Sequence, residues 1–417
     1  MDGVFAVYKP SGATSAQFIG EIQKLFTASD VFSEDLNKAK EKARYDLSSN
    51  KTWSKQKVEK KVRDLKVKIG HGGTLDPLAS GVLVIGVGLG TKKLQHYLTE
   101  CRKQYRTKAL LGISTTTGDS EGEIITQNKI DHVTKQMITE TGPKFVGNLK
   151  QTPPIFSALK INGLPFYEYA RKGIPLPAPI KTREIQVHGL EIHEEDSLKV
   201  DHEFNRLQSQ LDEDGKPKEH GLANNPTLND SPLYFSSQYL EKAEKEGLST
   251  EVSKPKLLDE GEILPEKLPM IHFTADVSSG TYIRSLVSDF GRALESSAYM
   301  VELIRTAQSD WKLGKNVFTI EDFKNRDERI WGPVLKKVLE QGSDVDVEEE
   351  LNSFSEKILP LIEKEQEVLA QKAKQEQEAE NAEKPEVTES DEQPQKAAET
   401  TDESAVPKKR HIDEVEN

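Results

Sequence analysis

The spacing of apolar residues predicts a domain that mixes helices and strands. An apolar stripe with helical period predicts an amphipathic helix over residues 15–26, with Ser15 as its cap. A second stripe predicts a helix in RSLVSDFGRALESS, which begins at Arg284. Alternating apolar and polar positions predict half-buried strands in YRTKALLG, IQVHGLEI and IHFTADV, and a continuous apolar run predicts a buried strand at residues 82–87. Helices and strands without strict alternation indicate the α+β class.

Two polar stretches interrupt or follow this pattern. Residues 194–269 are turn-rich, lack periodicity and carry a net charge of −9, which predicts an acidic surface insertion. Residues 343–417 carry a net charge of −14 and contain too few apolar residues to fold alone, so we expect a mostly disordered acidic tail.

Charge is concentrated in a third segment. The chain as a whole has a net charge of −13, yet residues 38–68 hold twelve Lys or Arg and only four Asp or Glu. A basic segment of this kind commonly binds a polyanion, above all nucleic acid. The alternative is a solvated helical insertion, since both signs of charge are mixed along it.

Composition excludes several classes of protein. The chain has no apolar run near the ~20 residues of a membrane span. Its single cysteine, Cys101, cannot form an internal disulfide or a cysteine-based zinc cluster. The N-terminal segment MDGVFAVYKPSG has no apolar signal region, so we expect a soluble intracellular protein.

The segment HGGTLDPLASGVLVIGVGLGT, residues 71–91, contains one acidic side chain, Asp76. Ionised carboxylates avoid such apolar surroundings unless a partner holds them. A turn or helix-cap aspartate before Pro77 is the simplest structural explanation. Gly86, Gly88 and Gly90 follow the spacing GxGxG rather than GxGxxG, which does not support a dinucleotide site.

Several motifs, in order, resemble the TruB family of pseudouridine synthases. KIGHGGTLDPLASGVLVIGVGLGTK resembles the family's catalytic motif G-x-L-D-P-x-A-x-G-x-L, and FAVYKPSGATS its N-terminal element. KQYRTKALLGISTTTGDSEGEI, QTPPIFSALKINGLPFYEYARKG, VSSGTYIRSLVSDFG and LIRTAQSDW resemble its later blocks. The insertions make the chain most similar to fungal members, and no match to the family's usual C-terminal RNA-binding domain follows the motifs.

The resemblance implies a fold and a reaction. The fold is a mixed, largely antiparallel sheet flanked by helices, with a central RNA-binding cleft. The reaction is isomerisation of the T-loop uridine of tRNA (position 55) to pseudouridine, without a guide RNA, cofactor or metal. Such a reaction needs a carboxylate beside the ribose and base, as nucleophile or as base, and Asp76 is the candidate. Synthases of mRNA or rRNA stem-loops and a non-catalytic RNA-folding chaperone are the alternatives.

The resemblance also assigns the remaining site residues. Arg284 is expected to hold Asp76 as a bidentate partner, and Tyr282 to lie near C5 of the uracil. Tyr105 would receive the flipped base, Leu303 would line the pocket and His71 would fill the space that the base vacates. Asp119 would contact RNA, with a solvated turn as its alternative. Tyr169 and Arg171, in an RNA-gripping thumb over residues 151–177, would bind the RNA loop.

The expected organisation is one catalytic domain over residues 1–342, which contains the basic insertion, the thumb and the acidic insertion, followed by the tail at 343–417. The expected partner is the T stem-loop of tRNA, with mRNA stem-loops as further substrates, no membrane contact and a monomeric protein. The basic insertion is expected to clamp the tRNA backbone. PKKRH, residues 407–411, is compatible with nuclear import, and the family resemblance adds mitochondria and cytoplasm as locations.

Overall fold

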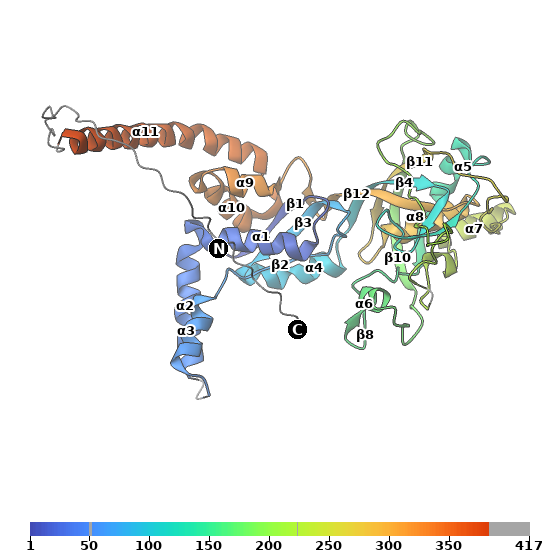
Figure 1. Ribbon diagram of the computed structural model, residues 1–417, viewed down its shortest axis with the longest axis horizontal. Coiled ribbons are helices and arrows are strands. Elements are labelled where there is room, and N and C mark those ends of the chain that lie inside the picture. The colour runs from blue at the N-terminus through green and yellow to red at the C-terminus, as the bar shows by residue number, and fades with distance from the viewer. Residues whose placement is uncertain (50–51, 223, 383–417) are drawn as a thin grey trace, which may run out of the picture. The chain divides into compact units, whose positions relative to one another are not determined.

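A ten-stranded mixed sheet organises the protein (Figure 1). The computed structural model describes residues 1–49, 52–222 and 224–382. The main path of the sheet is β14-β1-β3-β12-β4-β11-β10-β7, with β2 paired to β3 and β13 to β12. Of these pairings, β1 with β14 and β3 with β12 are parallel and the others antiparallel, which confirms the predicted mixed, largely antiparallel sheet.

The strands have the following bounds: β1 Gly3–Lys9, β2 Ile69–His71, β3 Ser80–Val87, β4 Lys103–Leu111, β5 Ile113–Thr115, β6 Ile124–Gln127, β7 Gly147–Gln151, β8 Lys160–Ile161, β9 Leu164–Pro165, β10 Arg183–Ile192, β11 Met270–Val277, β12 Ala298–Gln308, β13 Trp311–Lys312 and β14 Val317–Phe318. The helices are α1 Ser15–Ala28, α2 Ser33–Ser48, α3 Lys55–Arg63, α4 Leu94–Thr99, α5 Lys135–Thr141, α6 Phe166–Arg171, α7 Ser237–Glu246, α8 Ile283–Ala293, α9 Ile320–Asn325, α10 Glu328–Gln341 and α11 Val347–Ala382.

The predicted helices and strands form because their apolar residues share one face. In α1, Phe18, Ile22 and Phe26 are buried, as the periodicity predicts. The cap of this helix is Thr14 rather than Ser15: the Thr14 hydroxyl accepts from Gln17 N, and Gln17 Oε1 accepts from Thr14 N. Figure 1 shows α8 at the β4–β11 end of the sheet, and α1, α9 and α10 at the β1 end.

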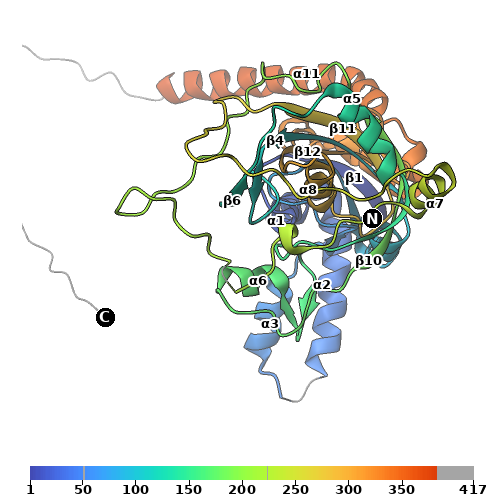
Figure 2. The ribbon, with the colours of Figure 1, turned by 90° about the vertical axis from the view of Figure 1, so that its right-hand side faces the viewer.

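Two projections leave the body of the domain. The basic insertion forms a helical hairpin of α2 and α3, and the segment predicted as a thumb contains β8, β9 and α6. The thumb has its own small apolar cluster, which includes Ile155, Phe166 and Ala170. Figures 1 and 2 agree that the hairpin and the thumb extend from the same side of the body.

The acidic insertion is not only a surface feature. It contains helix α7, and apolar residues from its C-terminal part, Leu264 and Leu268, are buried against Leu110 and Tyr299 of the sheet. These side chains attach the insertion to the strands through hydrophobic burial.

The predicted boundary after residue 342 is wrong. Helix α11 follows it, and Val345, Val347 and Leu351 are buried in the main core. By its internal contacts, the chain divides into one unit at Met1–Leu359 and a second at Pro360–Asn417. The rest of the predicted disordered tail, residues 383–417, lies outside the described residues. Among the described residues, no helix is long and apolar enough to cross a membrane.

Candidate active site

Asp76 lies on the turn that joins β2 to β3, and two glycines shape this turn. A Cβ on Gly72 would lie 2.6 Å from Tyr97 Cβ, so no side chain fits there. Gly73 has a φ of +137°, a conformation that L residues rarely adopt. Gly72 N donates to Val84 O, and Ala79 N to Asp76 O, which closes the turn on both sides of the carboxylate.

The loop between β1 and α1 holds the turn from the other side. Lys9 is fully buried, and its Nζ donates to Pro10 O and Ala13 O at 2.7 Å and to Pro77 O at 3.4 Å. Ser15 Oγ accepts from Leu75 N, and Gly12 N donates to Pro77 O. The N-terminal element FAVYKPSGATS therefore acts as a support for the Asp76 turn.

Arg284, in the first turn of α8, is the ionic partner of Asp76. Its Nε lies 2.8 Å from Asp76 Oδ2. The predicted bidentate pairing is wrong, because Nη1 donates to Thr117 O and Nη2 to Phe156 O, both at 2.7 Å. These two carbonyls fix the guanidinium, so that a single nitrogen faces Asp76. The Arg284 side chain is 5% exposed and that of Asp76 is 34% exposed, so the carboxylate is the accessible member of the pair.

Asp119 is the second carboxylate beside Arg284. Its Oδ2 lies 3.7 Å from Arg284 Nε, and its Oδ1 accepts from Thr117 Oγ1 and Glu121 N. The side chain is 4% exposed, so the solvated-turn alternative is wrong. The predicted contact of Asp119 with RNA stays a prediction. Burial raises the pKa of the neighbouring Glu121, and the charges of Asp119 and Asp76 raise it further.

Tyr282 immediately precedes α8 and is fixed through its backbone. The buried Gln151, at the end of β7, donates from Nε2 to Tyr282 O and accepts at Oε1 from Tyr282 N. The Arg183 guanidinium lies 5.3 Å from the centre of the Tyr282 ring. Burial raises the pKa of the Tyr282 phenol above its usual value, which keeps the phenol protonated at neutral pH.

Tyr105 and Leu303 lie on neighbouring strands of the sheet. Tyr105 in β4 is 7% exposed and Leu303 in β12 is 6% exposed, and both belong to the main core. Tyr105 pairs with Arg305 across the two strands, and Leu303 pairs with Thr107. Paired residues, and residues two apart on one strand, point to the same face of a sheet, so all four side chains lie on one face. Arg305 is buried and donates from Nε to Val82 O and from Nη2 to Gly73 O, and its Nη1 lies 3.5 Å from the Tyr105 hydroxyl.

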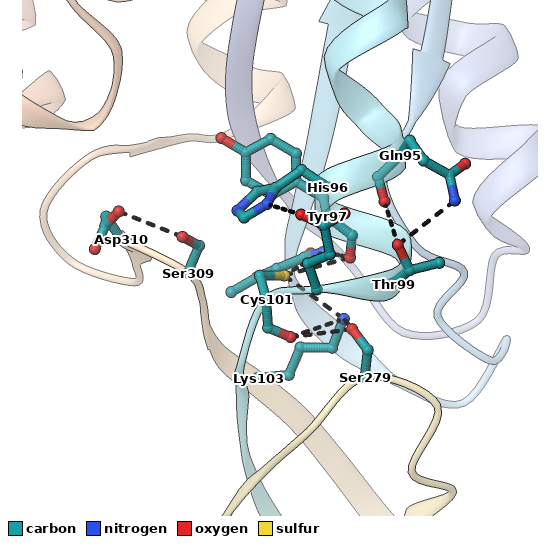
Figure 3. A network of polar contacts seen from close by, with 11 residues as sticks. Gln95, His96, Tyr97, Thr99, Cys101, Lys103, Ser279, Ser309 and Asp310 are labelled. Carbon is teal, nitrogen blue, oxygen red and sulfur yellow. Dashed lines mark hydrogen bonds and ion pairs between the residues drawn. The ribbon is translucent and has the colours of Figure 1, made fainter. Parts of the chain in front are cut away.

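His71 ends β2, directly before the two glycines of the turn that carries Asp76. It is partly buried, and burial lowers the pKa of its imidazole. Beneath the turn, Gln308 Nε2 donates to Gly72 O and to Tyr97 O. Figure 3 shows the adjoining polar network, in which Lys103 Nζ donates to Ser279 Oγ and lies 3.6 Å from the Cys101 sulfur.

The thumb residues are placed differently from one another. Tyr169 is 9% exposed, and its hydroxyl donates to Ile161 O at 3.2 Å, so it is held within the thumb, and its predicted contact with RNA stays a prediction. Arg171 is exposed, with its guanidinium 5.2 Å from the centre of the Tyr167 ring. These two side chains present a cation and an aromatic ring at the surface of the thumb.

The structure thus brings Asp76, Arg284 and Asp119 into direct contact and places Tyr282 two residues before Arg284. Sequence reasoning missed Gln151, Arg305 and Gln308. Their partners are backbone carbonyls and amides of distant segments, so no local pattern could reveal them. Among the described residues, no group of three or more His, Cys, Asp or Glu side chains could hold a metal ion.

Comparison with known proteins identifies the family. A model for TruB family pseudouridylate synthase (N terminal domain) matches residues 55–209. The tRNA pseudouridine synthase 4 of Saccharomyces cerevisiae is 49% identical over 378 residues, which cover 88% of this chain and 91% of that protein. The enzyme of the same name from Schizosaccharomyces pombe is 36% identical over 351 residues, 77% of this chain and 82% of that protein. A crystal structure of a Cbf5-Nop10-Gar1 complex aligns at 20% identity with a TM-score of 0.38, covering 77% of this chain and 53% of that one. The chain belongs to the TruB family of pseudouridylate synthases.

Proposed function

We propose that this protein converts the T-loop uridine of tRNA to pseudouridine, acts without a guide RNA and uses Asp76 as the essential group. The observation that carries the proposal is the accessible Asp76 carboxylate, held by the buried Arg284 on a turn that two neighbouring segments brace. The relatives with 49% and 36% identity are named as tRNA pseudouridine synthases, which supports tRNA as the substrate.

The reaction is an intramolecular rearrangement. The bond from C1′ to N1 of uracil breaks and a bond from C1′ to C5 forms, while N1 gains a proton and C5 loses one. Asp76 would act on the ribose or the base from one side of the pocket, as nucleophile or as base. The ion pair with Arg284 would hold the carboxylate in place while the substrate enters.

The other residues have supporting roles in this proposal. The T-loop uridine would leave its stack and bind near Tyr105 and Leu303, with His71 beside the space that it vacates. Tyr282 would lie near C5 of the flipped uracil. Asp119 would orient Arg284, and Arg171 with Tyr167 would contact the RNA loop from the thumb.

Purified protein incubated with an unmodified tRNA transcript tests the function. Pseudouridine mapped nucleotide by nucleotide should appear at the T-loop uridine with no other RNA present. Modification elsewhere in tRNA, or only in an mRNA or rRNA stem-loop, would contradict the proposed substrate. RNA binding with no pseudouridine at any position would favour the chaperone alternative.

We further propose that the protein acts in the nucleus, because the cluster PKKRH at residues 407–411 is compatible with import. Mitochondria and cytoplasm are the alternative locations. A fluorescent fusion truncated after residue 406 should lose nuclear enrichment, and an unchanged distribution would place the signal elsewhere.

A further inference from the structure

The hairpin of α2 and α3 carries basic side chains that the fold leaves without anionic partners. Its ion pairs are few: Lys38 pairs with Glu34, Arg44 with Glu59, and Arg63 with the adjacent Asp64. Within the part of the chain that the structure describes, no carboxylate lies within ion-pair distance of Lys57, Lys60 or Lys61. All three lysines are exposed. The hairpin therefore presents net positive charge that internal pairing does not neutralise.

These three lysines share one side of α3. Their spacing of three and four residues places them together on the helix, whereas Val58 and Val62 turn toward α2 and are buried. The Lys57 ammonium lies 4.5 Å from the centre of the Trp53 ring. An aromatic ring holds a cation in place without neutralising its charge. We call Lys57, Lys60 and Lys61 the lysine face.

The hairpin is a fixed support for the lysine face. Arg44 donates from Nε to Glu59 Oε1 at 2.8 Å and from Nη2 to Glu59 Oε2 at 3.1 Å, which joins the two helices with a forked ion pair. Leu36 of α2 and the two valines of α3 are buried. The Ser54 hydroxyl caps α3 at Lys57 N. A helix that is already folded loses less conformational freedom on binding than a flexible segment does.

The hairpin is close in sequence to the turn that carries Asp76. Helix α3 ends at Arg63 and β2 begins at Ile69, and β2 ends at His71, next to the turn that carries Asp76. The hairpin and the thumb extend from the same side of the domain in both views (Figures 1 and 2). A nucleic acid that lies along this side while its loop occupies the Asp76 site would meet both projections.

We propose that the lysine face binds backbone phosphates of the tRNA stem that adjoins the modified loop. This inference rests on the proposed function, since it requires tRNA as the substrate. The ligand is a phosphate backbone rather than unstacked bases, because the face consists of ammonium groups and Lys57 already lies over the Trp53 ring. Contacts of this kind strengthen binding independently of sequence and leave the chemical step unchanged.

The test is the salt dependence of tRNA binding by a K57Q/K60Q/K61Q variant. Glutamine keeps part of the stem and the helix propensity of lysine while it removes the charge. If all three lysines contact phosphates, the slope of log K against log salt should fall by roughly two to three, and Kd at 0.1 M salt should rise roughly 10- to 100-fold. Single-turnover pseudouridine formation at saturating tRNA should match wild type, and so should the melting temperature.

A K242Q/K245Q/K254Q variant is the matched control, because these lysines are also exposed but lie in the acidic insertion. Its slope and affinity should equal those of wild type. An unchanged slope in the lysine-face variant would overturn the inference, and so would an equal loss in both variants, which would reflect net charge alone. Failure of the proposed function has a different signature, since wild-type protein would then form no pseudouridine in tRNA.

Discussion

The central feature at the residue scale is the unequal burial of the Asp76–Arg284 pair. Arg284 is almost fully buried and bound to two backbone carbonyls, whereas a third of the Asp76 side chain is exposed. A buried guanidinium that is already fixed needs no rearrangement when a substrate arrives. The arrangement therefore leaves the carboxylate free to meet a substrate and keeps its counterion in place.

Lys9 gives a prediction for the pH dependence of stability. Burial lowers the pKa of its ammonium from 10.5 to about 8, although the charge of Asp76 opposes this shift. Below pH 8, Lys9 is charged in both states, so folding carries the full cost of burying the charge. Between about pH 8 and 10.5 the unfolded chain binds more protons at this position than the native protein, so the contribution of Lys9 to stability rises with pH.

The variant Lys9→Met isolates this contribution. The unfolding free energy of wild type minus that of the variant should increase between pH 7 and pH 10 in chemical denaturation. Lys24→Met, at an exposed site on α1, controls for the loss of one lysine. If the wild-type and Lys9→Met values change in parallel with pH, the buried ammonium does not titrate in this range.

At the element scale, Gln151 joins the end of β7 to the start of α8. Its two hydrogen bonds satisfy both the amide and the carbonyl of Tyr282. Gln151→Leu should leave the Tyr282 amide unpaired and remove one of the two donors to the Tyr282 carbonyl, which also accepts from Leu286 N, and should lower the unfolding free energy by about 2 kcal/mol. Because α8 also carries Arg284, the single-turnover rate should fall by more than tenfold, with less than a threefold change in tRNA affinity.

Partial rescue distinguishes positioning from general instability. Gln151→Glu keeps an acceptor for Tyr282 N but loses the donor to Tyr282 O, so its rate should lie between those of wild type and Gln151→Leu. A Gln151→Leu enzyme with the wild-type rate would show that the start of α8 is held by other contacts.

The sequence predicted best those helices and strands whose apolar residues are spaced so that one face is buried. Phe18, Ile22 and Phe26 of α1 are buried at the predicted period, and β4, β10 and β11 correspond to the predicted alternating segments. The capping residue of α1 was misplaced by one position, because Thr14 and Ser15 are adjacent and both belong to the residue types that cap helices. The burial of Leu264 and Leu268 was not predicted, since their segment has no periodicity and the contacts arise only from tertiary packing.

At the scale of the whole molecule, the C-terminal edge of the core gives a prediction. Val345, Val347 and Leu351 are buried in the main core, beyond the boundary that composition suggested. A chain ending at residue 342 should lose several kcal/mol of stability, because it exposes the core surface that these side chains cover. A chain ending at residue 359 should melt within a few degrees of the full-length protein, and equal melting of both truncations would contradict this assignment.

In the candidate active site, too, the sequence predicted some contacts and could not show others. The motifs predicted the pairing of Asp76 with Arg284, which the ion pair confirms, but the catalytic roles that they assign to these two residues and to Tyr282 stay predictions. They could not show that Arg284 uses one nitrogen for Asp76, since its other nitrogens bind carbonyls at Thr117 and Phe156 from distant segments. Tyr169 was predicted to bind RNA as part of a loop that mixes aromatic and basic side chains, and the sequence could not show that its side chain is 9% exposed with its hydroxyl bound to Ile161 O.

The most direct test of the central claim is single-turnover pseudouridine formation by Asp76→Asn at saturating tRNA. Asparagine keeps the size of the side chain and removes its charge, so folding and tRNA affinity should stay close to wild type. The account predicts no detectable pseudouridine at the T-loop uridine on the time scale of the wild-type reaction. A rate within tenfold of wild type, a barrier change below about 1.4 kcal/mol, would show that Asp76 is not the essential group.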